Sequence, residues 1–283
     1  MPRKGGSANI SGVEYELWFV ALKYAEAFLN PDMEVTAQAR FLNTGVIGQD
    51  DHITSVDDVV VSEKGKFTHF TIKQNAPEQG WTTTALISNG VINEVKEQFL
   101  KTPNNLIILI SQSDSKLFRE YFRRIEYCQS REDIERELGN GIIDWDKLLN
   151  YTKLPEDDLI KMCSNCGVRV YPLEDIKKTV KEKFLGRVNE PDQASERLFM
   201  YAIERAKWKV KTSQADIINY LRKKGIYEMS ATDLVSISSD LVHYSASLNE
   251  NPIGFTGLEN SKIERDETDQ ILQWIQRPLE IKN

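Results

Sequence analysis

The sequence predicts an α/β protein in which a mixed sheet is flanked by helices and is followed by an all-helical C-terminal lobe. Three observations predict this fold class: an amphipathic helix opens the chain, strand-like runs follow it, and a second helix then leads into a continuous apolar run. Beyond Pro191 only helical patterns occur. We therefore predict an α/β domain over residues 1–190 and a helical domain over residues 191–283, for assembly, partner docking or DNA contact.

The first half of the chain opens with a helix and an antiparallel sheet. Apolar residues recur at helical spacing over residues 11–29, and Asn30 and Pro31 end this helix. Three strand-like runs follow, and the last two are joined by a short turn at Gly65, which is typical of a β-hairpin. The three runs occupy residues 33–42, 53–62 and 66–75.

A strand–helix–strand step comes after the hairpin. Helical period returns over residues 89–101, and residues 105–111 form a continuous apolar run, which is typical of a strand buried on both faces. One more strand is expected at residues 167–172. The remaining helices are expected at residues 114–128, 131–138, 142–163 and 173–186 and, in the C-terminal lobe, at residues 193–209, 213–224, 230–249 and 264–277.

The composition is that of an ordinary globular protein. Of the 283 residues, 40% are hydrophobic and 28% are charged, and no apolar run approaches the roughly 20 residues that cross a bilayer. The basic N-terminus is followed by no apolar segment of the kind that directs secretion. We therefore expect a soluble protein in the cytoplasm, without a membrane partner.

The net charge of −7 argues against nucleic-acid binding through a general coat of positive charge. One segment, residues 204–224, nevertheless carries seven basic and two acidic residues. This segment is either a surface that contacts phosphate or a solvated helix face. Its candidate contacts to nucleic acid are Arg205, Lys207, Lys209 and Lys211.

Two cysteines, Cys163 and Cys166, have the spacing of half a zinc or redox site. Structural zinc needs four ligands, and the sequence offers no matching second pair among its three cysteines and three histidines. We therefore expect both cysteines to be reduced and structural.

The residues with the most chemical content lie on the two strands of the hairpin. Asp57 and Asp58 open the second strand-like run, and Lys73 lies near the end of the third. Neighbouring strands are about 4.8 Å apart, so the acids and the lysine are expected at one edge of the sheet. Alternation places Thr71 and Lys73 on one face and Gln74 on the other. Carboxylates here suit a divalent cation that activates water for phosphodiester hydrolysis, and the lysine suits stabilisation of the developing charge.

A third acid is available on the first helix. Glu14 lies four residues before Trp18 and seven before Ala21, which places it on the core-facing side of that helix. A carboxylate in this position needs a cation. Glu14 is therefore either a metal ligand or an N-terminal charge that the helix dipole favours.

Several short motifs follow one another over about residues 8–190, namely Glu14, the pair Asp57 and Asp58, Thr71-x-Lys73, and Trp81 before a helix. Their order resembles that of the double-stranded-DNA endonuclease domain found in CBASS effectors that carry a SAVED sensor, and in the Lamassu and STAND-type Avs anti-phage systems. The resemblance implies a restriction-endonuclease-like, or PD-(D/E)xK, fold. It also implies a DNA endonuclease that depends on Mg²⁺ or Mn²⁺.

The same resemblance assigns roles to individual residues. It implies that Lys73 acts in catalysis and, with Gln74, contacts nucleic acid. Thr71 departs from the family pattern, in which this catalytic position is commonly glutamine, or glutamate in PD-(D/E)xK enzymes at large; a hydroxyl is a weaker metal ligand than a carboxylate. The implied metal ligands are Glu14, Asp57, Asp58 and the backbone carbonyl of Ile72.

The rest of the chain shows no phosphate-binding loop of the GxxxxGK[ST] form and leaves no room for a SAVED domain. We therefore expect sensing and energy use to belong to SMC-like or STAND-type ATPase partners. The nuclease would stay inactive until such a partner complex, or self-association into a homo-oligomer, activates it. Two alternatives stay open: a catalytically degenerate subunit of the same fold that serves assembly or DNA binding, and an unrelated α/β scaffold in which the two aspartates mark a turn.

Overall fold

The computed structural model describes residues 6–37, 58–74, 80–208 and 210–229; for residues 6–11, 207 and 208 it describes the backbone alone. Its centre is a mixed five-stranded sheet in which the strands lie side by side in chain order. The strands β1, β2 and β3 are antiparallel neighbours, whereas β3, β4 and β5 are parallel. The strands are β1 (Met33–Ala37), β2 (Val59–Glu63), β3 (Lys66–Lys73), β4 (Leu106–Ser111) and β5 (Cys166–Val170).

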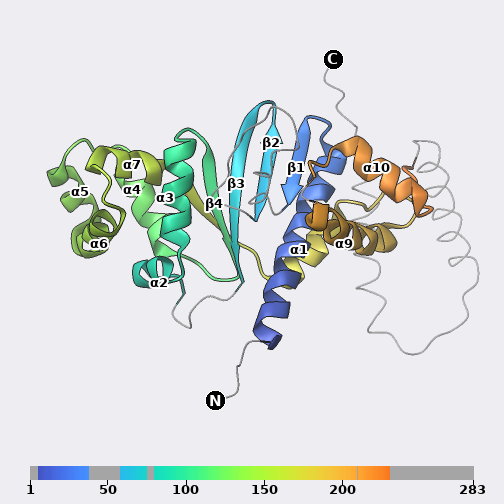
Figure 1. Cartoon of the computed structure of the whole chain (residues 1–283), viewed down its shortest axis with the longest axis horizontal. Coiled ribbons are helices and arrows are strands. Elements are labelled where there is room, and N and C mark those ends of the chain that lie inside the picture. The colour runs from blue at the N-terminus through green and yellow to red at the C-terminus, as the bar shows by residue number, and fades with distance from the viewer. Residues whose placement is uncertain (1–5, 38–57, 75–79, 209, 230–283) are drawn as a thin grey trace, which may run out of the picture. The chain divides into compact units, whose positions relative to one another are not determined.

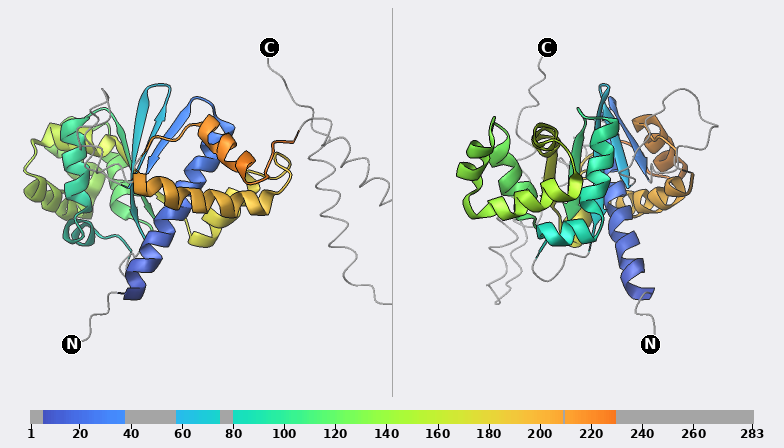
Figure 2. Two further views of the ribbon diagram at one scale, coloured as in Figure 1. Left: turned by 45° about the vertical axis from the view of Figure 1, so that its right-hand side comes forward. Right: turned by 60° about the vertical axis from the view of Figure 1, so that its left-hand side comes forward.

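One face of the sheet is covered by the first helix and by helices from the end of the described chain. Figures 1 and 2 show α1, α9 and α10 on the same side of the strands. Their apolar side chains form one core with Phe70, Ile72, Ile108 and Ile110 of the sheet. The helices are α1 (Gly6–Leu29), α8 (Leu173–Glu182), α9 (Pro191–Trp208) and α10 (Gln214–Lys223).

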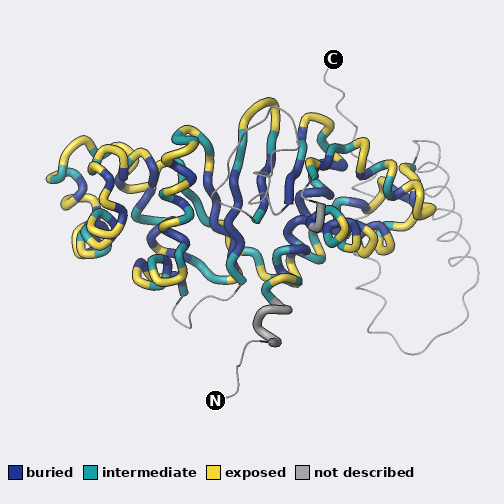
Figure 3. The backbone as a smooth tube through the Cα atoms, viewed as in Figure 1, coloured by how far each residue is buried: buried dark blue, intermediate teal, exposed yellow. Residues whose placement is uncertain are grey.

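The opposite face is covered by the helices between β3 and β5. Figure 1 shows them as a separate layer beside β4. Their core includes Ile107 and Leu109, so alternate residues of β4 enter opposite cores, and Figure 3 shows the strands as the buried centre of the molecule. The elements are α2 (Thr83–Ser88), α3 (Val91–Lys101), a π-helical turn (Leu117–Tyr121), α4 (Phe122–Ile125), α5 (Arg131–Leu138), a 3₁₀ turn (Gly139–Gly141), α6 (Ile142–Thr152) and α7 (Glu156–Ser164).

The β2–β3 hairpin is closed by a two-residue turn. Lys64 and Gly65 both have positive φ, at 49° and 77°, and Glu63 pairs with Lys66. Positive φ at both central positions is the signature of a type I′ turn, whose twist matches that of the flanking strands. The hairpin predicted from Gly65 is therefore confirmed, and its register places Val59 opposite Phe70.

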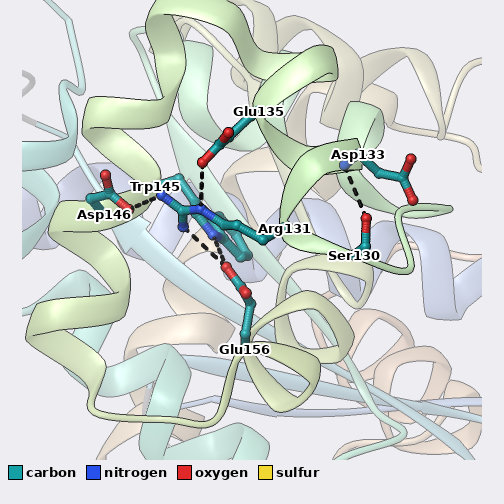
Figure 4. Close-up of polar contacts among 7 residues, drawn as sticks. All are labelled: Ser130, Arg131, Asp133, Glu135, Trp145, Asp146 and Glu156. Carbon is teal, nitrogen blue, oxygen red and sulfur yellow. Dashed lines mark hydrogen bonds and ion pairs between the residues drawn. The ribbon is translucent and has the colours of Figure 1, made fainter.

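The helices between β4 and β5 are joined by an arginine-centred cluster, drawn in Figure 4. Arg131 of α5 bonds to Glu135 on the same helix, to Asp146 of α6 and to Glu156 of α7. Trp145 donates its indole N–H to the same Glu156 oxygen at 2.8 Å. Hydrogen bonding, first of all to Asp146, raises the pKa of Arg131. A single cation thus connects three helices.

Two helical segments differ from the sequence-based expectation. Residues 142–163 form two helices, because Lys153 adopts φ 57° and Pro155 starts the second helix as its N-cap. Residues 114–128 form a π-helical turn followed by α4, which ends at Ile125. The predicted helices at residues 230–249 and 264–277 lie outside the described residues.

Helices α9 and α10 share a core with α1. Trp18 stacks on Phe199 with ring centroids 4.6 Å apart, and Tyr24 lies 5.6 Å from Tyr201. Val35 of β1 exchanges two backbone hydrogen bonds with Thr212, at 3.0 and 2.8 Å. The predicted boundary near residue 190 stays a prediction, since residues 230–283 are not described. Among the described helices, none is long and apolar enough to cross a membrane.

Candidate active site

The candidate site lies where β3 ends, on the face covered by α3. The Thr71 side chain is fully buried, and that of Lys73 is 25% exposed. Ile72, between them, enters the core on the α1 side. The alternation predicted for this strand is therefore confirmed, and it turns Thr71 and Lys73 toward the same helix.

Glu94 of α3 meets both of these side chains. The Thr71 hydroxyl donates to Glu94 Oε2 at 3.0 Å, and the Lys73 ammonium lies 3.3 Å from each Glu94 carboxylate oxygen. The Glu94 side chain is only 18% exposed, so this carboxylate faces the sheet. The lysine and the acid thus form a partly buried ion pair that a neutral hydroxyl supports.

Glu94 is the site residue that the sequence-based reasoning missed, although the sequence contains a signal for it. The helix α3 buries Val91 and Gln98, which lie three residues before and four residues after Glu94. Residues at these spacings share one face of a helix. An acid on the buried face of an amphipathic helix needs a partner, and the partner here is Lys73.

Asp58 is the acid that the hairpin brings to the same place. It immediately precedes β2, and one of its carboxylate oxygens accepts a hydrogen bond from the backbone amide of Ile72. Since Val59 pairs with Phe70, Asp58 lies at the register position opposite Thr71. The sequence-based placement of Asp58 beside the end of β3 is confirmed. Asp57, the other predicted acid, lies outside the described residues.

The next strand closes the site on its other side. Ser111 of β4 pairs with Lys73 in the parallel register, and its hydroxyl accepts the indole N–H of Trp81 at 2.7 Å. Trp81 is buried, and its backbone amide donates to Asp114. Trp81 therefore anchors the segment before α2 to the end of β4, next to Lys73.

The side-chain atoms at this site that could bind a metal ion are all oxygens. Asp58 and Glu94 offer carboxylate oxygens and Thr71 offers a hydroxyl, the hard oxygen donors that Mg²⁺ and Mn²⁺ prefer. The residues present thus fit a divalent cation chemically. Within the described ranges, no three side chains among His, Cys, Asp and Glu gather into a metal-binding group.

Glu14 is placed differently from the expected third ligand. Its carboxylate lies 3.4 Å from Lys177 of α8, and its side chain is 43% exposed. Lys177 also pairs with Glu174, at 3.2 Å. Glu14, predicted as a metal ligand on the core-facing side of the first helix, is instead partly exposed and pairs with a lysine on the α1 side of the sheet, and the carboxylate that contacts Lys73 is Glu94.

Gln74 points to the opposite side from Lys73, as the alternation predicts. Its Oε1 is buried near the first helix, 3.9 Å from where a β-carbon on Gly12 would lie. Among the described residues this oxygen has no hydrogen-bond partner. The structure thus separates Gln74 from the lysine with which the sequence-based prediction grouped it.

The basic segment is partly engaged in internal contacts. Arg205 donates to the Thr212 hydroxyl at 3.0 Å and to the Lys211 carbonyl at 2.9 Å. Lys211 pairs with Glu34 of β1 at 3.2 Å. These contacts connect the end of α9 to the edge of the sheet. The structure does not describe the Lys207 side chain or any part of Lys209.

The surroundings of the two closely spaced cysteines favour a structural role over metal binding or redox chemistry. Cys163 is fully buried, and the thiol of Cys166 donates to the Met162 carbonyl at 3.1 Å. Burial raises the pKa of both thiols, which disfavours the thiolate that metal binding and redox chemistry require. Both cysteines are free.

The fold and the site together define a mixed α/β protein with a lysine–carboxylate cluster at the end of a central strand. Comparison with known proteins gives no matching family model and no match among curated proteins. The similar solved structures include those of two proteins. The Acinetobacter baumannii Cap4 SAVED/CARF-domain containing receptor with the cyclic trinucleotide 3'3'3'-cAAA has 11% identity and a TM-score of 0.45, over 74% of this chain and 44% of that one. The Moraxella osloensis Cap4 SAVED/CARF-domain containing receptor has 12% identity and a TM-score of 0.44, over 75% and 46%.

Each match covers less than half of the solved chain. At these identities and TM-scores the likeness by itself establishes neither an activity nor a ligand for this chain.

Proposed function

We propose that the chain is a metal-dependent DNA endonuclease with a PD-(D/E)xK type of site. The observation that carries the proposal is that Asp58 accepts from the Ile72 amide, and Lys73 pairs with Glu94, at the same end of β3. Phosphodiester hydrolysis needs carboxylates for a divalent cation and a nearby positive charge, and these are the groups that the hairpin and α3 supply. A mixed sheet flanked by helices is also the fold that the motif resemblance implies.

The residues would divide the work as follows. Asp58 and Glu94 would hold a Mg²⁺ or Mn²⁺ ion, which supplies Lewis-acid activation of the phosphate and of water. Lys73 would orient the attacking water and stabilise the charge that develops on the phosphate. The hydrogen bond from the Ile72 amide fixes the Asp58 carboxylate against β3. Asp57 remains a predicted ligand from the sequence.

The biological setting in this proposal is bacterial anti-phage defence. The motif order resembles nuclease domains of CBASS, Lamassu and Avs systems, in which a sensor controls the nuclease. We therefore propose double-stranded DNA as the substrate and an SMC-like or STAND-type ATPase as the partner. The nuclease would act after this partner, or self-association, has activated it.

The test is plasmid cleavage by the full-length protein, alone and together with the products of neighbouring genes, in Mg²⁺ or Mn²⁺. We expect Lys73→Ala to lower the cleavage rate by about 100-fold or more, because it removes the positive charge at the reacting phosphate. Lys66→Ala is the matched control, since Lys66 lies exposed at the other end of β3. Equal rates for the wild type and Lys73→Ala, in the activated assembly, would overturn the proposal.

A catalytically degenerate assembly or DNA-binding subunit is the second candidate. Two observations favour it: position 71 carries a hydroxyl where the nuclease family has an amide or an acid, and the described residues contain no group of three potential metal ligands. Such a subunit would bind DNA without cutting it under any activating condition. Binding that Lys73→Ala leaves unchanged, with no cleavage, would select this candidate.

A further inference from the structure

The helix α10 ends in three consecutive cations on the surface of the molecule. Arg222, Lys223 and Lys224 are all exposed, whereas Ile217 and Leu221, on the opposite side of the helix, are buried in the core shared with α1. Cations are favoured at the C-terminus of a helix, because the helix dipole is negative there. The position of these three residues in the helix therefore indicates no ligand by itself.

A sharp turn after α10 brings a second segment beside these cations. Gly225 has φ 80°, and the amide of Ile226 donates back to the Leu221 carbonyl at 3.0 Å. This is a Schellman turn, which needs a left-handed residue that glycine supplies without strain. The residues that follow run antiparallel to residues 187–189, the segment before α9.

The two segments form a short antiparallel ribbon. The Met229 amide donates to the Arg187 carbonyl at 2.8 Å, and the Asn189 amide donates to the Tyr227 carbonyl at 3.1 Å. The Asn189 side chain also accepts from the Tyr227 amide at 2.8 Å. Arg187 is exposed, and Tyr227 is 56% exposed. The ribbon therefore holds an arginine and an aromatic ring at the surface beside the end of α10.

One ion pair connects the ribbon to the helix. Arg222 donates from Nε and Nη2 to the same Glu228 oxygen, each at 3.0 Å. Among the described residues, no ion pair involves Arg187 or Lys223. The dipole of α10 does not account for Arg187, since this arginine comes from another segment. We name this surface the α10 patch; it consists of Arg187, Arg222, Lys223, Lys224 and Tyr227.

We propose that the α10 patch binds the phosphate backbone of double-stranded DNA, apart from the candidate active site. Arginine, lysine and tyrosine side chains are among the groups that contact phosphate and sugar, and clustered cations in an acidic chain are a local footprint for them. The inference rests on the proposed function for the choice of DNA, and it deepens that function by naming a surface that holds DNA without a metal ion. Lys73 faces α3 on one side of the sheet, whereas α10 packs with α1 on the other (Figure 1).

The exposed face of α10 favours duplex DNA over RNA. Ala215, Asn219 and Lys223 follow one another at intervals of four residues and are all exposed, so one face of the helix is open along its length. The major groove of B-DNA is about 12 Å wide and admits a helix, whereas that of duplex RNA is deep and narrow. A helix in the groove would place the cations at its end beside the phosphates.

The α10 patch differs from the contacts that the sequence predicted in the same segment. Arg205 bonds to the Thr212 hydroxyl, and Lys211 pairs with Glu34. Part of the charge at the start of the segment is thus used within the fold. The patch lies at the other end of the segment and gains Arg187 from outside it.

The experiment is fluorescence anisotropy of the whole chain with a labelled DNA duplex in EDTA, at salt concentrations between about 50 and 200 mM. EDTA prevents metal-dependent cleavage, so binding is measured alone. We expect Arg187→Gln combined with Lys223→Gln to bind about tenfold more weakly. The slope of log affinity against log salt should become shallower by about 2, because each lost phosphate contact removes about one released counterion.

Arg123→Gln combined with Lys161→Gln is the matched control. It removes one arginine and one lysine, both exposed, from α4 and α7, so the net charge of the protein changes equally. This control should keep the affinity and the salt slope of the wild type. A general effect of net charge would weaken both double variants alike.

The inference fails if the wild type binds no duplex in EDTA at the lowest salt concentration, or if the two double variants bind equally well. An RNA duplex that binds as tightly as the DNA duplex would also overturn it. Should the patch variant lose its fold, as judged by circular dichroism, Lys224→Gln alone should make the salt slope shallower by about 1. Equal slopes for Lys224→Gln and Lys161→Gln would then overturn the inference.

The two proposals can fail separately. Cleavage by a protein whose DNA binding does not depend on the α10 patch overturns only this inference. Binding through the patch by a protein that never cuts DNA supports this inference and counts against the nuclease proposal.

Discussion

At the scale of single residues, the buried phenol of Tyr24 in α1 makes the stability of the fold depend on pH in the alkaline range. Its side chain is fully buried, and its phenolic oxygen accepts a hydrogen bond from the Thr212 hydroxyl at 3.4 Å. Burial raises the pKa of Tyr24 from 10.0 to about 12. The folded protein therefore keeps the phenol neutral over a pH range in which the unfolded chain ionises it.

This shift predicts the direction in which stability changes with pH. The contribution of Tyr24 to the free energy of unfolding is complete below pH 10 and is lost as the pH rises toward about 12, by up to about 1.4 kcal/mol per pH unit. Tyr24→Phe should cost on the order of 1 kcal/mol at pH 7 and should lose less stability than the wild type between pH 10 and pH 12. Urea unfolding at both ends of this range measures the difference.

A control for this prediction is Tyr227→Phe, which removes a hydroxyl from a ring that is 56% exposed. The prediction is wrong if Tyr24→Phe and the wild type lose equal stability above pH 10. Other buried tyrosines such as Tyr15 affect both proteins alike, because the comparison removes one hydroxyl only.

The same scale shows which part of the site could be predicted from the sequence. Alternation along a strand has a period of two, and this fixed the common face of Thr71 and Lys73 once the strand was recognised. Glu94 could not be assigned in the same way, because the sequence does not say which sheet residue lies opposite either of the two acids of its helix, Glu94 and Glu97. Glu14 was predicted as a metal ligand, but it pairs with Lys177, a contact that depends on how α8 packs.

At the scale of elements, Arg131 determines how the helices between β4 and β5 hold together. Its guanidinium bonds to acids on α5, α6 and α7, and Glu156 also accepts from Trp145 (Figure 4). Arg131→Met would keep the aliphatic stem but leave these acids facing one another. We expect a loss of about 1–2 kcal/mol in the free energy of unfolding, less than for a fully buried pair because Arg131 is 32% exposed.

Arg131→Met should loosen the helices α5–α7 locally, in addition to lowering the free energy of unfolding of the whole protein. Amide hydrogen exchange should accelerate in α5–α7 and remain unchanged in α1, which lies on the other side of the sheet. Arg136→Met is the matched control, since Arg136 belongs to α5 but is 69% exposed and bonds to Asp133 alone among the described residues. Equal exchange in the two variants would show that Arg131 does not connect these helices.

The elements themselves differ in how far the sequence could predict them. The hairpin and β4 were predictable because a glycine turn and a continuous apolar run are local signals. The π-helical turn at Leu117–Tyr121 has no such local signal; its Phe118 ring packs 4.8 Å from that of Phe122 in the core. The break at Lys153 was signalled by Pro155, but the periodic pattern around it masked that signal.

At the scale of the whole molecule, the two predicted domains share a core in the described chain. The first helix is covered by α9 and α10, with Trp18 on Phe199 and Gln214 bonded to the Phe28 carbonyl at 2.8 Å. Apolar periodicity predicted each of these helices correctly but could not show which surface covers which. The contacts join residues that lie nearly the whole described chain apart, and no local pattern contains that information.

This arrangement predicts where the chain can be cut. A fragment of residues 1–190 would expose the face of α1 that carries Trp18 and Tyr24, and it would leave the edge of β1 without Thr212. Because these side chains are among the largest in the core, we expect that fragment to aggregate or to lack a cooperative urea transition. A fragment of residues 1–230, the limit of the first compact unit, keeps α9 and α10 and should unfold cooperatively. Cooperative unfolding of the shorter fragment, with the longer one no more stable, would instead support an independent domain that ends near residue 190.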